Sequence, residues 1–158
     1  MLRKLGLLAF LLLLLTGCGA GDDDGLRLGD HIVGTWLRGW GEGDVVVEGY
    51  VADDDDEDAP QWGPDNIAID RFVFNGDGAY NGMVRSGSFT AWDTEGEIIY
   101  EGNYKCDNGT LKLEYLNGGS RQSIVCQIVS FTEDIMKVRY QNEDPNVSVT
   151  LTLRKSSE

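Results

Sequence analysis

TLKLEYLNGGSRQSIVCQIV, residues 110–129, is the stretch that decides the fold of this chain. Apolar residues recur at every second position in both of its halves, as Leu111, Leu113 and Tyr115 and then as Ile124, Cys126 and Ile128. A period of two is typical of half-buried β-strands, because successive side chains of a strand point to opposite faces. Gly118 and Gly119 follow an asparagine between the two halves. The stretch therefore predicts an antiparallel hairpin with a tight glycine turn.

The same period continues on both sides of this hairpin. It recurs in four further sets: Phe72 and Phe74; Tyr100, Gly102 and Tyr104; Met136, Val138 and Tyr140; Val147, Val149, Leu151 and Leu153. Turn sequences rich in Gly, Asn and Asp separate the sets, at residues 75–78, 107–109 and 142–146. We predict an all-β domain, an antiparallel up-and-down meander of eight to ten strands. Such a meander must hide its edges, so we expect a closed barrel, with two packed sheets as the alternative.

The N-terminal residues have the pattern of an export signal. Arg3 and Lys4 precede an apolar run at residues 5–15, which is too short to span a bilayer but fits the apolar core of a signal peptide. The junction Leu15-Thr16-Gly17-Cys18 resembles the bacterial lipobox, which implies that residues 1–17 are removed and that Cys18 carries lipid. Several acyl chains on one cysteine would hold the domain at a membrane. An ordinary secretory signal with an incidental cysteine is the alternative.

Residues 18–29 are expected to form the lipidated cysteine and a flexible acidic tether, and residues 30–158 a single β domain. The aspartates at 22–24 resemble the surface-export signal of Bacteroidetes lipoproteins, although Gly19, Ala20 and Gly21 come first. In bacterial lipoproteins an aspartate directly after the lipidated cysteine signals retention in the inner membrane, and here that position is Gly19. The resemblance implies an outer-membrane lipoprotein, with the periplasmic and cell-surface faces both left open.

The charge of the chain limits its partners. The formal net charge is −14, and it becomes about −16 when Arg3 and Lys4 leave with the leader. A field of this sign opposes binding to nucleic acid or to anionic lipid. We expect a monomer whose charged partners, if it has any, are cationic.

Several short motifs follow one another in the order of a known family. They are Gly34-Thr35-Trp36, Phe72-x-Phe74 with Asp77-Gly78-x-Tyr80, Gly102-x-Tyr104, Asn108-x-Thr110-Leu111-x-Leu113 and Leu153-Arg154. Over residues 30–155 the chain resembles the lipocalin-like domains of small Bacteroidetes lipoproteins, apart from an acidic insertion at 52–66 and an extra loop at 86–97. The resemblance implies a lipocalin-like barrel in which Trp36 closes one end and Arg154 crosses its ring, a cation–π contact.

Catalysis has little support in the sequence. His31 is the only histidine, and no Gly-x-Ser-x-Gly motif accompanies it, so a hydrolytic triad is not indicated. We expect no enzyme activity and no cofactor. Five aspartates could hold Ca²⁺ weakly, although their spacing is not that of an EF-hand and a solvated loop is the simpler interpretation: Asp53, Asp54, Asp55, Asp56 and Asp58.

Three tryptophans are the candidates for ligand binding. Trp40, Trp62 and Trp92 are expected in loops flanked by glycine or aspartate, where a large ring is unusual. Exposed rings stack on sugars or line the mouth of a cavity, whereas the alternative is that they cap the barrel ends. The sequence therefore predicts a non-enzymatic binding module for a small apolar or glycan ligand. A scaffold lipoprotein that contacts another envelope protein is the second possibility.

Cys106 and Cys126 remain once Cys18 is lipidated, and export favours a disulfide. The positions of the predicted turns argue against a disulfide between these two cysteines. If Asn108-Gly109 centres one hairpin and Gly118-Gly119 the next, both cysteines pair with Leu111 from opposite sides. They would then lie two strands apart, about 9–10 Å, beyond the reach of an unstrained bridge unless a bulge intervenes.

Overall fold

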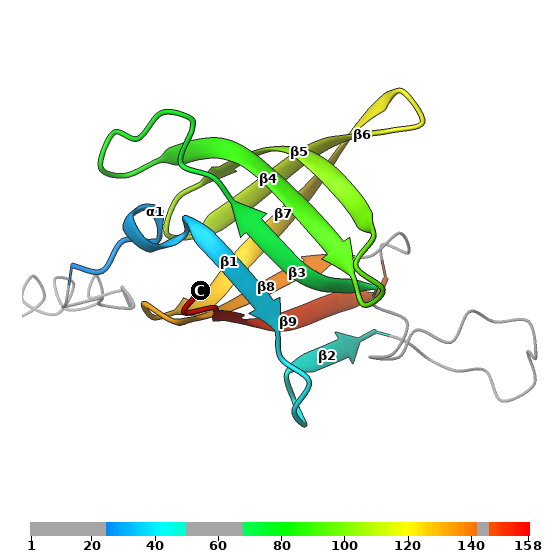
Figure 1. Cartoon of the computed structure of the whole chain (residues 1–158). Coiled ribbons are helices and arrows are strands. Elements are labelled where there is room, and N and C mark those ends of the chain that lie inside the picture. Colours follow the sequence, from blue (N-terminus) through cyan, green and yellow to red (C-terminus); the bar gives the residue numbers. More distant parts are fainter. Residues whose placement is uncertain (1–24, 50–67, 142–145) are drawn as a thin grey trace, which may run out of the picture.

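The computed structural model describes residues 25–49, 68–141 and 146–158 (Figure 1). These residues form an antiparallel, closed eight-stranded barrel with one extra strand and one short helix. The elements in chain order are α1 (Leu28–His31), β1 (Gly34–Arg38), β2 (Val45–Glu48), β3 (Ile69–Phe74), β4 (Arg85–Asp93), β5 (Ile98–Cys106), β6 (Thr110–Asn117), β7 (Ser120–Phe131), β8 (Ile135–Gln141) and β9 (Ser148–Lys155). Nine strands lie within the predicted eight to ten, and the predicted all-β meander and barrel closure are confirmed.

The barrel closes between its first and last strands. From β3 to β9 each strand pairs with the next one along the chain, and β1 pairs with both β3 and β9. Pairing of β1 with β9 joins the two outermost strands of the meander, so neither is left as a free sheet edge along its whole length. Among the described residues, no helix is long and apolar enough to cross a bilayer.

Strand β2 continues the line of β1 along β9. Both strands run antiparallel to β9, with Arg38 opposite Leu153 and Val45 opposite Leu151. Thr152 lies between these pairs, accepts a hydrogen bond from Gly39 N–H at 2.9 Å and donates its own N–H to Asp44 O at 2.7 Å. Residues 39–44 therefore form a loop that leaves and rejoins one ladder, and Figure 1 shows β2 beside β9, outside the ring of strands.

The core fills the inside of the barrel, and the predicted alternation places it there. The apolar sets predicted from the period of two face inward, and Met136 of β8 and Val149 and Leu153 of β9 are fully buried. Helix α1 covers the end of the barrel at which β1 begins, with Leu28 and Ile32 fully buried. We call this the closed end. The other end, where β1 leads into residues 39–44 and β6 turns into β7, is the open end.

The predicted register of β5, β6 and β7 is confirmed. Cys106 pairs with Leu111, and Leu111 pairs with Cys126. Both cysteines are buried in the core as free thiols. Burial raises the pKa of the Cys106 thiol to about 11 and that of Cys126 to about 12. The two thiols are therefore neutral and weakly nucleophilic near neutral pH.

Trp36 is fully buried at the closed end, and its indole N–H donates to Ile32 O at 2.7 Å. The cation over its ring is Lys155, with Nζ 5.5 Å from the ring centroid. The expected contact with Arg154 is therefore wrong. Arg154 pairs with Leu37, faces outward and binds the Asp44 carboxylate at 2.9 Å. The reason is parity, because Leu153 faces inward and the next residue on a strand must face outward.

Two other expectations are corrected. The packed chain begins at Leu28, because α1 joins the core, and not at residue 30. Trp92 lies in strand β4 rather than in a loop, since Phe89 and Ala91 alternate inward beside it. Other predicted residues lie outside the part of the chain that the structure describes, namely Cys18, Trp62, Asp53, Asp54, Asp55, Asp56 and Asp58.

Candidate functional site

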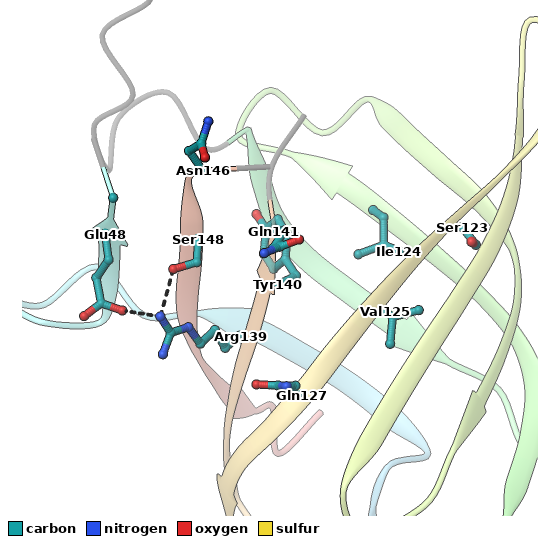
Figure 2. Close-up of a pocket in the computed structure, with 11 residues that line it drawn as sticks. Glu48, Ser123, Ile124, Val125, Gln127, Arg139, Tyr140, Gln141, Asn146 and Ser148 are labelled. Atoms are coloured by element: carbon teal, nitrogen blue, oxygen red, sulfur yellow. Dashed lines mark hydrogen bonds and ion pairs between the residues drawn. The ribbon is translucent and has the colours of Figure 1, made fainter. Parts of the chain in front are cut away.

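A hollow with described walls lies at the open end, where β7 and β8 separate. Their ladder begins at Gln127 opposite Arg139 and contains a bulge between Ile128 and Ser130. Among the described strands, residues 120–126 of β7 pair with β6 alone. A cleft of about 820 Å³ occupies the gap between β7 and the end of β8 (Figure 2). Its volume lies within the range of about 300–1,000 Å³ that small-molecule sites occupy.

One wall of the cleft is polar. Arg139 of β8 lies across the outer face of β9, where it binds the Glu48 carboxylate of β2 at 2.8 Å and donates to Ser148 Oγ at 3.0 Å. Figure 2 shows this guanidinium held between the two strands, on the side of the cleft opposite Val125. An exposed ion pair adds little stability. Its effect here is to hold Arg139 in one orientation beside the cleft.

The floor of the cleft is apolar. Ile124 of β7 and Tyr140 of β8 face the barrel interior, and both line the cleft. The same two side chains line a void inside the core, whose other walls are apolar. Burial raises the pKa of the Tyr140 hydroxyl, and the nearby Cys126 and Tyr100 side chains raise it further. Tyr140 therefore faces the cleft as a neutral phenol.

The interior itself is nearly full. The void that meets the cleft at Ile124 and Tyr140 has a volume of about 10 Å³, roughly that of one water molecule. Phe72, Phe74 and Tyr104 fill the space nearby, with the Phe74 and Tyr104 ring centroids 5.1 Å apart. A ligand enclosed in the barrel has no room without movement of these side chains. The cleft, by contrast, is already open.

Trp40 lies in the loop of residues 39–44 at the open end, as predicted. Its ring is 60% exposed, so it does not cap the barrel. The Arg38 guanidinium covers one face, with Cζ 4.0 Å from the ring centroid, and the indole N–H donates to Asp70 Oδ1 at 3.2 Å. The side chain is held in place without being buried.

Trp92 lies on the outer wall, on β4. It pairs with Arg71 of β3, whose guanidinium stacks on the ring with Cζ 4.4 Å from its centroid. Arg71 follows Asp70, whose carboxylate accepts the Trp40 N–H. Two neighbouring residues of β3 therefore each hold one of the two tryptophans. Neither ring lines the cleft, and ligand binding by the tryptophans stays a prediction.

No pattern in the sequence indicates the cleft. Its walls are common residues such as Gln127, Arg139 and Ser148, and it exists because two strands separate. The bulge between Ile128 and Ser130 is seen only in the structure, so it offered no sequence signal for this break. Among the described residues, no group of three or more His, Cys, Asp or Glu side chains could hold a metal ion.

Comparisons with protein-family models, with curated proteins and with solved structures find no match to this chain.

Proposed function

We propose that the protein is a lipid-anchored envelope lipoprotein with a lipocalin-like barrel that acts as a non-enzymatic binding module. The proposal rests on the cleft of about 820 Å³ between β7 and β8, which meets the apolar interior at Ile124 and Tyr140. A few fixed polar groups beside an apolar floor are typical of small-molecule sites.

The ligand of this cleft is a small amphipathic molecule. Its apolar part lies against Ile124 and Tyr140, where burial of apolar surface contributes about 25 cal/mol per Å². Its polar part lies at the outer wall, within reach of Arg139, Gln127 and Ser148. Because Glu48 already balances the charge of Arg139, the wall favours an uncharged polar group over a strongly anionic one.

A neutral fluorophore that brightens in apolar surroundings, N-phenyl-1-naphthylamine, tests the cleft with the chain from Gly19 onward, which retains every described residue. Val125 lines the cleft and is 54% exposed, so Val125→Trp narrows the cleft with little cost to the core. Val129 is the matched control, because it is on the same strand, is 55% exposed and does not line the cleft.

We expect saturable enhancement of the probe with the parent chain and with Val129→Trp, and a loss of affinity of about tenfold with Val125→Trp. Thermal melting of both variants shows whether the barrel is intact. Equal binding by the two variants, or no enhancement by the parent chain, would reject the cleft as the site.

Attachment to the membrane rests on Cys18, and a separate measurement tests it. Mass spectrometry of the protein from bacterial membranes should find an N-terminal Cys18 carrying acyl chains. Cys18→Ser should move the protein from the membrane fraction to the soluble fraction, since a protein without acyl chains lacks the apolar anchor. An intact leader, or a mature N-terminus without lipid, would contradict the anchor while leaving the cleft proposal standing.

Contact with another envelope protein is the second candidate. The outer face of the barrel exposes several apolar side chains, among them Leu116 at 69% and Ile98 at 55%. Exposed apolar surface is a feature of protein–protein contacts when it is contiguous. Crosslinking in intact cells that depends on Leu116 and not on Val125 would favour this function over the small-molecule site.

A further inference from the structure

The exposed ring of Trp40 is the feature of the open end that the cleft does not use. A tryptophan ring is rarely left 60% exposed, because burying it would remove a large apolar area from water. Yet the ring is fixed from two directions, by the Arg38 guanidinium below it and by the Asp70 carboxylate at its N–H. Ordering an exposed side chain costs conformational entropy, so the arrangement prepares a surface in advance.

One face of the ring remains for a ligand. Arg38 is only 4% exposed, and so the face it covers is turned toward the barrel. The exposed area of Trp40 belongs to the opposite face. Asp70 Oδ1 accepts the indole N–H, and no side chain or backbone group among the described residues binds Oδ2 of the same carboxylate. A flat apolar face therefore lies beside a hydrogen-bond acceptor.

The loop that carries Trp40 is itself fixed. Asp44 Oδ2 accepts the Gly41 N–H at 2.9 Å, and the Arg154 guanidinium binds both oxygens of Asp44 at 2.9 and 3.2 Å. Burial is the largest single influence on Asp44 and acts to raise its pKa, but the donors from Gly41 and Arg154 together hold that pKa below the usual value. Gly39 completes the arrangement, since a Cβ there would fall 2.3 Å from Asp44 Oδ2.

We propose that Trp40 and Asp70 form a stacking subsite for a neutral pyranose ring of a glycan. A sugar ring has a face of C–H groups that lies flat on an aromatic ring, and hydroxyl groups at its rim that donate to a carboxylate. A purely apolar ligand needs walls around it, and the described residues form no pocket over the exposed side of Trp40. The subsite is separate from the proposed small-molecule site, because the cleft is lined from β2, β7, β8 and β9.

The surrounding charge selects against acidic sugars. Asp44 and Asp70 are carboxylates, exposed Glu42 lies in the same loop, and the whole chain carries a formal charge of −14. Among the described residues, the cation in contact with the Trp40 ring is Arg38, and the ring covers it. A uronic acid would bring a like charge toward these carboxylates, whereas glucose or N-acetylglucosamine units bring none.

The indole N–H resonances of the four tryptophans provide the test, measured by nuclear magnetic resonance on the full chain in a sugar-free detergent. The resonance of Trp40 is the one that Trp40→Phe removes. The probes are cellohexaose, chitohexaose with N-acetyl groups, and a hexamer of galacturonic acid. We expect the two neutral oligomers to shift the Trp40 resonance saturably and the acidic one to leave it in place.

Variants separate stacking from general surface contact. Affinity for the neutral oligomers, measured by isothermal titration calorimetry because these variants lack the Trp40 resonance, should weaken about tenfold in Trp40→Ala and much less in Trp40→Phe, which keeps a ring. Leu37→Ala is the matched control, an apolar residue of β1 that is 41% exposed and has no ring to stack. It should bind as the parent chain does, and so should the cleft variant Val125→Trp. An unmoved Trp40 resonance with both neutral oligomers, or equal losses in Trp40→Ala and Leu37→Ala, would overturn the proposal.

Discussion

Lys155 lies over the ring of Trp36, with Nζ 5.5 Å from its centroid, and the same ammonium donates a hydrogen bond to His31 O. The two residues are direct partners across β1 and β9. Their contact therefore connects the strands that close the barrel with the residue that ends α1. It is the point at which helix, first strand and last strand meet.

Removing the charge of Lys155 should destabilise the closed end. Lys155→Met keeps most of the stem and loses the cation–π contact and the bond to His31 O, so we expect a loss of about 1–2 kcal/mol. Arg154→Met loses an exposed ion pair to Asp44 and should cost about 0–1 kcal/mol. Urea denaturation at pH 7 measures both. A larger loss in the arginine variant would show that the wrong cation has been assigned to Trp36.

The core thiols should be free in the purified protein. Denaturing it without reductant and counting thiols should give one for Cys106 and one for Cys126, because the two lie on strands that β6 separates. In the folded protein, alkylation of both should be slow at pH 8, since neutral buried thiols react poorly. A single disulfide in the unreduced, denatured chain contradicts this pairing.

Alkali should destabilise the barrel through Cys126. Burial raises its pKa to about 12, above the ordinary value near 9, so the folded state holds the proton more tightly. Its contribution to stability is complete below about pH 9 and is lost as the pH rises toward 12. Cys126→Val removes the titrating group, so between pH 9 and 11 its melting temperature should fall less than that of the parent chain. If the melting temperatures of the two proteins fall equally between pH 9 and 11, the loss of stability in alkali belongs to groups other than Cys126.

Gly87 of β4 should not tolerate a side chain. A Cβ there would fall 2.1 Å from Asn75 O and 2.8 Å from Tyr104 Cε1, two groups that are joined by a hydrogen bond of 2.9 Å. Gly87→Ala should therefore cost about 1–3 kcal/mol in urea denaturation. Gly109→Ala is the control, because its nearest atom would be 3.6 Å away, and its cost should stay within about 0.5 kcal/mol.

The register was predictable where tight turns determine it. Asn108-Gly109 and Gly118-Gly119 each centre a hairpin, so the pairing of Leu111 with both cysteines follows from counting outward from the turns. Period-two alternation then gives the inner face. The same rule, applied one residue further, would have placed Arg154 outside and Lys155 inside.

Other features had weak local signals. The inward residues of β4 are small or separated by Ser and Thr, so the strand that holds Trp92 lacked strong apolar contrast. The cleft and the subsite at Trp40 depend on where a ladder ends and on contacts such as Trp40 with Asp70, which are 30 positions apart. Contacts of this kind arise from the three-dimensional path of the chain, which no short pattern encodes.

Pairing of β1 with β9 also governs the time course of folding. Leu37 of β1 pairs with Arg154 of β9, so the barrel cannot close until nearly the whole described chain is available to fold. Until then β1 and β8 each have an edge that can capture a neighbouring molecule. Pairings between distant positions slow folding and lengthen this vulnerable interval. If the chain is exported in extended form, as proposed above, a chaperone that shields both strands until β9 arrives would protect it during this interval.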